Sequence, residues 1–137
     1  MSVVLVGYIP TPEGEAALHE AIQEAGHRGA RLLVICSHRT ADEEEPNGET
    51  QDEEVDRLHS HLSTTGLDFE VRSLVRGFEP AEDLISLAEV TGATLVVIGL
   101  RRRTPAGKMV LGSNAQRVLL DAPCPVLAVK APETGAH

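Results

Sequence analysis

The stretch Thr94-Leu95-Val96-Val97-Ile98-Gly99 decides the fold of this chain. It is an unbroken run of apolar and β-branched residues, too short to cross a membrane, and it ends in a glycine. Such a run is typical of a strand that is buried on both faces of a parallel sheet. We expect the strand to finish at Ile98 and the chain to turn into a loop at Gly99.

A helix and a second buried strand are predicted to follow. Gly112 precedes Ser113, which we expect to be the N-cap of the helix because serine is among the preferred capping residues. One apolar stripe is expected along this helix, at Ala115, Val118 and Leu119. The next buried strand is predicted at Val126–Val129. Open α/β sheets bind ligands at the carboxyl ends of their strands, and a helix N-terminus favours an anion such as phosphate.

These residues resemble the carboxyl-terminal signature of the universal stress protein family. The resemblance is carried by Gly99, Gly112, Ser113, Val118 and the run Cys124–Val129. In the family's nucleotide-binding members, the first glycine is followed after two residues by a second one. Arg102 occupies that second position here. An arginine there either obstructs the approach of a phosphate to the backbone or supplies the phosphate with a positive charge.

Length and composition narrow the classes of protein. The chain has 137 residues, enough for one domain, and its scarcity of aromatic residues (2%) predicts an aliphatic core. A formal charge of −9 disfavours binding to nucleic acid or to an anionic membrane, because the field of the protein repels polyanions. We find no signal peptide pattern and no apolar stretch near the roughly 18 residues of a spanning helix, so we expect a cytoplasmic protein.

The rest of the chain alternates between strand and helix patterns. Strands are predicted at 3–6, 31–36 and 69–75, and helices begin at Pro12, Thr50 and Pro80. The acidic segment at about 37–50 is expected to be a solvated loop, and its spacing does not match a calcium-binding loop. The tail at 131–137 is expected to be loose. Cys36 and Cys124 are expected to be free thiols.

The helix predicted at 50–65 has an apolar side and an acidic side. Val55, Leu58 and Leu62 are expected to face the core, whereas the outward residues are expected to be Asp52, Glu53, Glu54 and Asp56. His59 and His61 are two residues apart, which turns them about 200° from each other on a helix. We therefore expect surface histidines and no shared metal.

The fold class predicted from this alternation is a three-layer α/β/α sandwich around a parallel sheet, of Rossmann-like type and one domain. The resemblance to the stress protein family extends from Val3 to Lys130. It implies a five-stranded sheet in the order 3-2-1-4-5. It also implies a homodimer formed in part along the last strand, Val126–Val129.

The resemblance also implies a site for ATP or a related nucleotide, with magnesium as an accompanying ion. The candidate residues are Tyr8, Ser37, Gly99, Arg102, Gly112, Ser113 and Asn114. Tyr8 stands at the position assigned to the family's aspartate, and it either packs at the strand end or contacts a base. Ser37 stands near the family's apolar adenine contact, and Arg101, Arg102 and Arg103 form either a solvated loop or a phosphate clamp.

No catalytic pattern is recognisable in the sequence. Walker, dinucleotide, zinc and serine-hydrolase signatures are all incomplete or missing, so we do not expect an enzyme. Three functions stay open: a nucleotide-binding stress-response dimer, a dimeric interaction module that has lost its ligand, and a sensor of another small anion. An Arg102→Ala change that abolishes binding of a non-nucleotide anion would favour the third.

Overall fold

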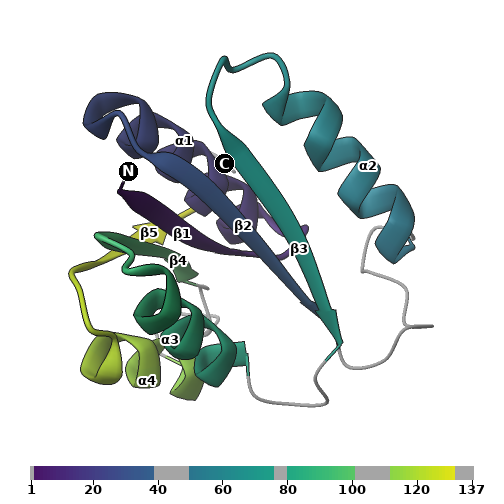
Figure 1. Cartoon of the computed structure of the whole chain (residues 1–137). Coiled ribbons are helices and arrows are strands. Elements are labelled where there is room, and N and C mark those ends of the chain that lie inside the picture. The colour runs from purple at the N-terminus through teal and green to yellow at the C-terminus, as the bar shows by residue number, and fades with distance from the viewer. Residues whose placement is uncertain (1, 39–49, 76–79, 101–111, 132–137) are drawn as a thin grey trace.

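The computed structural model describes residues 2–38, 50–75, 80–100 and 112–131, and it shows an α/β/α sandwich (Figure 1). Five parallel strands form one sheet in the order β3-β2-β1-β4-β5. The strands are β1 (Val3–Tyr8), β2 (Arg31–His38), β3 (Phe69–Val75), β4 (Leu95–Leu100) and β5 (Val126–Lys130). The helices are α1 (Pro12–Arg28), α2 (Gln51–Leu62), α3 (Pro80–Thr91) and α4 (Ser113–Asp121). The predicted fold class and strand order are confirmed.

Two helices cover each face of the sheet (Figure 1). Because side chains of a strand alternate between faces, Val4 and Val6 of β1 pack with α1 and α2, whereas Leu5 packs with α3 and α4. Leu58 and Leu62 bring α2 onto the first face, and Leu84, with its neighbours on α3, covers the second. The core is aliphatic, as the composition predicts.

Local capping explains where the first two helices begin. The Thr11 hydroxyl accepts a hydrogen bond from the Gly14 amide at 3.2 Å, and Pro12 follows at the first helical position. Thr50 and Glu53 form a reciprocal capping box at the start of α2. Helix α1 ends at Gly29, whose φ of 62° is left-handed.

Four of the predicted strands end later than expected. Strand β1 continues past Val6 to Tyr8, which pairs with Cys36, and β5 continues to Lys130, which pairs with Leu100. Strand β4 continues through Gly99, which pairs with Val129, and ends only at Leu100. Strand β2 likewise includes Ser37 and His38, paired with Leu74 and Val75 of β3. In each case a neighbouring strand supplies backbone partners beyond the predicted end, and the apolar pattern by itself does not show this.

Four expectations about helices also need correction. The N-cap of α4 is Gly112, whose carbonyl accepts the first intrahelical bond from Gln116 at 2.9 Å, so Ser113 is the first helical residue. Leu119 is 40% exposed and lies off the buried stripe that Val118 anchors. Glu54 is buried instead of facing outward, because it lies one turn before Leu58 on the inner side of α2. Helix α2 also ends at Leu62, earlier than the predicted end at residue 65.

Several predictions concern segments that the structure does not describe. The acidic run at 42–45, the three arginines at 101–103 and the tail from residue 132 lie outside the described residues. Neither Cys36 nor Cys124 forms a disulfide, as expected. Among the helices described, none has the length and apolarity to cross a bilayer. His59 and His61 are exposed, and the described residues contain no group of side chains suited to a metal.

Candidate functional site

A cleft of about 400 Å³ opens at the carboxyl edge of the sheet between β1 and β4. The chain order reverses there, since β1 continues toward β2 on one side and β4 toward β5 on the other. This is the position at which open α/β sheets bind ligands, and the volume falls within the usual range of small-molecule sites. The lining residues come from the ends of β1 and β4, from β2, and from the first turns of α1, α3 and α4.

The start of α4 forms an open wall of the cleft. Gly112, Ser113 and Asn114 line it, and the side chains of the latter two are exposed. The N-cap residue, Gly112, has no side chain with which to cap this helix, and the first intrahelical bond is donated by Gln116. The amide N–H groups of residues 113–115 therefore have no acceptor within the helix. They carry the positive end of the helix dipole, which is suited to an anionic group.

The start of α1 forms a closed wall on the opposite side. Glu13 and Gly14 line the cleft there, and both lie in close contact with other backbone. A Cβ atom on Gly14 would overlap the carbonyl of Ile9, and one on Gly99 would overlap the carbonyl of Glu13. Glycine at these two positions lets the chain pack against itself, so α1 begins directly over the ends of β1 and β4.

Between the two walls the cleft is apolar. Ile35 and Ile98 contribute from the sheet, while Leu84 and Val118 contribute from α3 and α4. Gly7 leaves room for Leu84, because an added Cβ would lie 2.9 Å from Leu84 Cδ1. Such a surface suits an aromatic ring system, with the polar α4 terminus beside it.

Tyr8 lies at the back of the cleft and its hydroxyl is already bonded. It donates to Glu15 Oε2 in α1 and accepts from Arg57 Nη2 in α2 at 2.8 Å. Arg57 Nη1 also lies 3.7 Å from Glu15 Oε2, which closes the triangle. We call Tyr8, Glu15 and Arg57 the Tyr8 network. Because Tyr8 is only 2% exposed, stacking on a base would require it to leave these bonds.

The network keeps the Tyr8 phenol neutral. Burial raises its pKa above the ordinary value for tyrosine, and the hydrogen bond to Glu15 raises this pKa further. The hydrogen bond from Arg57 acts in the opposite direction with a smaller effect. The hydroxyl is consequently a stable donor toward the Glu15 carboxylate. This geometry favours the packing interpretation of Tyr8 over direct contact with a base.

Five of the seven candidate residues lie around the same cleft: Tyr8, Gly99, Gly112, Ser113 and Asn114. Ser37 is in β2, but its side chain is outside the description, as is the whole of Arg102. Sequence reasoning missed Gly14 and the cleft role of Glu13. The sequence does contain a signal for Gly14. Glycine lowers helix propensity, so a glycine in the first turn of a helix indicates a close contact that requires it there.

Comparison with known proteins identifies the family. A sequence model of the universal stress protein family matches residues 1–130. The chain belongs to the universal stress protein family. A universal stress protein of Mycolicibacterium smegmatis is 42% identical over 129 residues, which cover 93% of this chain and 97% of the relative.

Solved structures of stress proteins share this fold. A universal stress protein from Archaeoglobus fulgidus is 31% identical, with a TM-score of 0.74 over 95% of this chain and 98% of the other. Another Archaeoglobus fulgidus structure is in complex with dAMP. It is 26% identical, with a TM-score of 0.66 and the same coverage of 95% and 98%. This universal stress protein thus has a structural relative that was solved with an adenine nucleotide.

Proposed function

We propose that this universal stress protein binds ATP or a related adenine nucleotide in the cleft between β1 and β4, for regulation in the stress response. The observation that carries the proposal is the α4 terminus, which directs uncapped amide groups into a cleft with an apolar interior. An adenine ring would lie against the apolar residues, and a phosphate would accept hydrogen bonds from the first turn of α4. The relative in complex with dAMP supports this choice of ligand.

We infer that the protein binds its ligand without performing chemistry on it. The side chains that line the cleft are chiefly apolar, and Ser113, an exposed polar one, lies on the helix terminus where it can bond an anion. Magnesium would accompany ATP as a counterion held by the phosphates. Arg102, which stands where nucleotide-binding relatives have a glycine, would supply positive charge to the phosphates.

We also propose that the protein is a homodimer that associates along β5. Val126 to Val129 are only half-buried in the single chain, although they are apolar and form the edge of the sheet. An exposed apolar edge strand readily pairs with another chain. Light scattering on the purified protein is expected to give the mass of two chains, and the mass of one chain would contradict this part of the proposal.

Thermal unfolding of the nucleotide-stripped protein tests the ligand. Melting is followed with and without ATP and magnesium, and separately with AMP and cyclic AMP. A ligand at 100 times its Kd adds about 2.7 kcal/mol to the free energy of unfolding, which raises the midpoint by several degrees. No shift with any nucleotide would contradict the proposal and favour a dimeric interaction module.

Two substitutions of Arg102 separate the nucleotide site from a general anion site. Arg102→Gly restores the glycine of nucleotide-binding stress proteins, so nucleotide binding is expected to persist. If Arg102→Ala abolishes a shift that inorganic phosphate or sulfate produces in the original protein, while nucleotides produce none, the cleft is a sensor of another small anion.

A further inference from the structure

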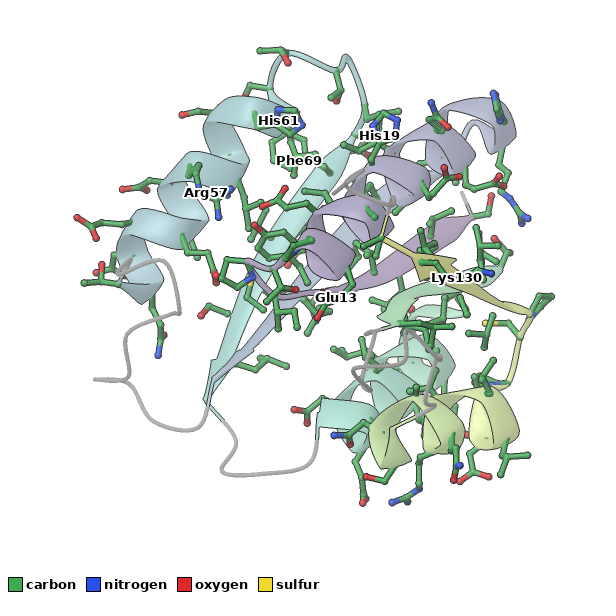
Figure 2. The ribbon with its side chains drawn as sticks, turned by 180° about the vertical axis from the view of Figure 1, so that it is seen from behind. Glu13, His19, Arg57, His61, Phe69 and Lys130 are labelled. Carbon is green, nitrogen blue, oxygen red and sulfur yellow. The ribbon has the colours of Figure 1, made fainter. Side chains whose placement is uncertain are left out.

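Arg57 connects a peripheral helix to the back of the cleft. Figure 2 shows it on the side of α2 that faces α1. Its guanidinium donates to the hydroxyl of Tyr8, 49 residues earlier in the chain, and pairs with Glu15. The guanidinium carbon also lies 5.7 Å from the centre of the Tyr8 ring, within reach of a cation–π interaction. One side chain of α2 therefore contacts both β1 and α1.

Tyr8 transmits that contact to the lining of the cleft. It lies between Gly7 and Ile9, and all three residues border the cleft. Its backbone is fixed on one side by pairing with Cys36 of β2. Its ring is fixed by burial and its hydroxyl by Glu15 and Arg57. A shift of the Tyr8 ring would displace the end of β1, where the ligand is proposed to bind.

Two further contacts of α2 are made with β3, at the edge of the sheet. The ring of His59 lies edge-on to Phe69 with centroids 5.3 Å apart, and Ser73 donates to Gln51 at 3.2 Å. Neither contact includes a residue of the cleft lining. They hold α2 on the sheet without fixing Tyr8, so they serve as structural controls for the Tyr8 network.

We infer that Arg57 is a positioning residue for the cleft, and that occupation of the cleft and the docking of α2 are linked through Tyr8. This inference rests on the proposed nucleotide function. Linkage is reciprocal, so the contact of Arg57 with Tyr8 tightens the binding of the ligand, and the ligand in turn strengthens the hold of Tyr8 on α2 through Arg57. The acidic surface of α2 then becomes the part of the molecule through which a partner could sense the ligand.

Calorimetric titration of the full chain with ATP and magnesium, and with AMP, tests the inference. Tyr8→Phe removes only the hydroxyl, and Arg57→Gln removes the charge while keeping a polar side chain. Each is expected to weaken nucleotide binding about fivefold, a typical coupling between sites. Arg57→Lys keeps the charge beside Glu15 and is expected to recover part of the loss. His59→Ala is expected to leave Kd within roughly twofold, as a substitution at an independent site does.

Hydrogen exchange supplies a readout that a purely structural role would not change. In the unsubstituted protein, nucleotide is expected to increase the protection of α2 amides, and in Tyr8→Phe this increase is expected to shrink. If the unsubstituted protein binds no nucleotide, the proposed function and this inference both fail. If it binds nucleotide while Tyr8→Phe and Arg57→Gln bind equally well, and α2 protection does not respond, this inference alone is overturned.

Discussion

The two walls of the cleft both depend on glycine, but for opposite reasons. At the α1 wall, Gly14 and Gly99 bring backbone so close together that a Cβ atom at either position would overlap a carbonyl. At the α4 wall, no atom of the described residues lies within 4 Å of a Cβ built on Gly112. One wall uses the missing side chain to pack the protein against itself, and the other leaves the space open. A glycine at a ligand cleft therefore does not by itself indicate ligand contact.

The polar groups of the two walls also differ: those at the α1 wall are bonded within the protein, whereas those at the α4 wall are exposed. Beside α1, the hydroxyl of Tyr8 is bonded within the protein by Glu15 and Arg57. At α4, the side chains of Ser113 and Asn114 are exposed, and the N-cap Gly112 offers the helix no side-chain acceptor. The α1 wall is a preformed support, and the α4 wall holds the donors available to a ligand. Substitutions at the two walls are thus expected to separate stability from binding.

Gly14→Ala is expected to have the largest effect. The new methyl group overlaps the Ile9 carbonyl, which is backbone and cannot move aside without displacing the start of α1. Overpacking of this kind costs about 3 kcal/mol of the free energy of unfolding. Urea unfolding measures it. Gly26→Ala in the same helix is the matched control, since a Cβ there meets nothing within 4 Å.

The control is expected to change stability in the opposite direction. Alanine has a higher helix propensity than glycine, so Gly26→Ala should stabilise by up to about 1 kcal/mol. If both substitutions change the free energy of unfolding equally, α1 is not held against Ile9 as the structure shows.

Gly99→Ala is expected to cost about 2 kcal/mol by the same overpacking mechanism. Its Cβ would meet the carbonyl of Glu13, so the start of α1 must move away from β4. Both urea unfolding and nucleotide titration should report the change, because this wall supports the cleft. Unchanged stability with lost binding would instead assign Gly99 to ligand contact alone.

Gly112→Ala is expected to separate the two properties. Its φ of −68° suits any residue, so the stability cost is limited to the weaker N-cap, about 0.5 kcal/mol. The methyl group would occupy the space beside the first amides of α4, and nucleotide affinity should fall about tenfold, equivalent to roughly 1.4 kcal/mol. Titration calorimetry gives the affinity. Nucleotide binding at full strength would place the phosphate elsewhere.

The smallest effect is expected at the β3 edge, which provides an electrostatic reference remote from both walls. The Glu70 carboxylate accepts from Arg72 at 2.6 Å and lies 3.3 Å from Arg31. The hydrogen bond from Arg72 lowers the pKa of Glu70 below its ordinary 4.5. Since this side chain is a third exposed, Glu70→Gln should cost less than about 1 kcal/mol at neutral pH.

The pH dependence of that cost has a definite sign. A carboxyl group whose pKa is lowered on folding stabilises the native state above its unfolded pKa, near 4.5, and the stabilisation is lost as pH falls through the folded pKa. Urea unfolding at pH 7 and near pH 3 should therefore show the difference between Glu70→Gln and the original protein shrinking. A difference that grows toward low pH would contradict the pairing with Arg72.

The fold was predictable because its signals are local. Buried runs such as Leu95–Ile98, and the helix start formed by the N-cap Thr11 and by Pro12, can be recognised from residues adjacent in the sequence. The strand order came from the resemblance to the family, since periodicity does not rank strands. Expectations failed where a partner distant in sequence decides the outcome: β5 extends β4 through Gly99, and the inner side of α2 includes Glu54.

The site was predictable only in part, for the same reason. The lining residues at the start of α4, Gly112, Ser113 and Asn114, are consecutive in the sequence, and a glycine before a helix marks them. The Tyr8 network joins three separate elements, and nothing in the sequence near Tyr8 indicates that Arg57 will bond to it. Gly14 is required because the Ile9 carbonyl, five residues earlier, lies against it. That contact depends on the conformation of the loop from Ile9 to Thr11, which the sequence pattern does not predict.

Amide chemical shifts during a nucleotide titration test the central claim most directly. A protein labelled with ¹⁵N is titrated with ATP and magnesium, and the backbone resonances are followed residue by residue. The account predicts that the largest shifts fall on the amides of Ser113, Asn114 and Ala115, which face the cleft without a helical acceptor. Smaller shifts are expected along Gly7 to Ile9. Saturable shifts that leave the start of α4 unchanged, or no shifts at all, would contradict it.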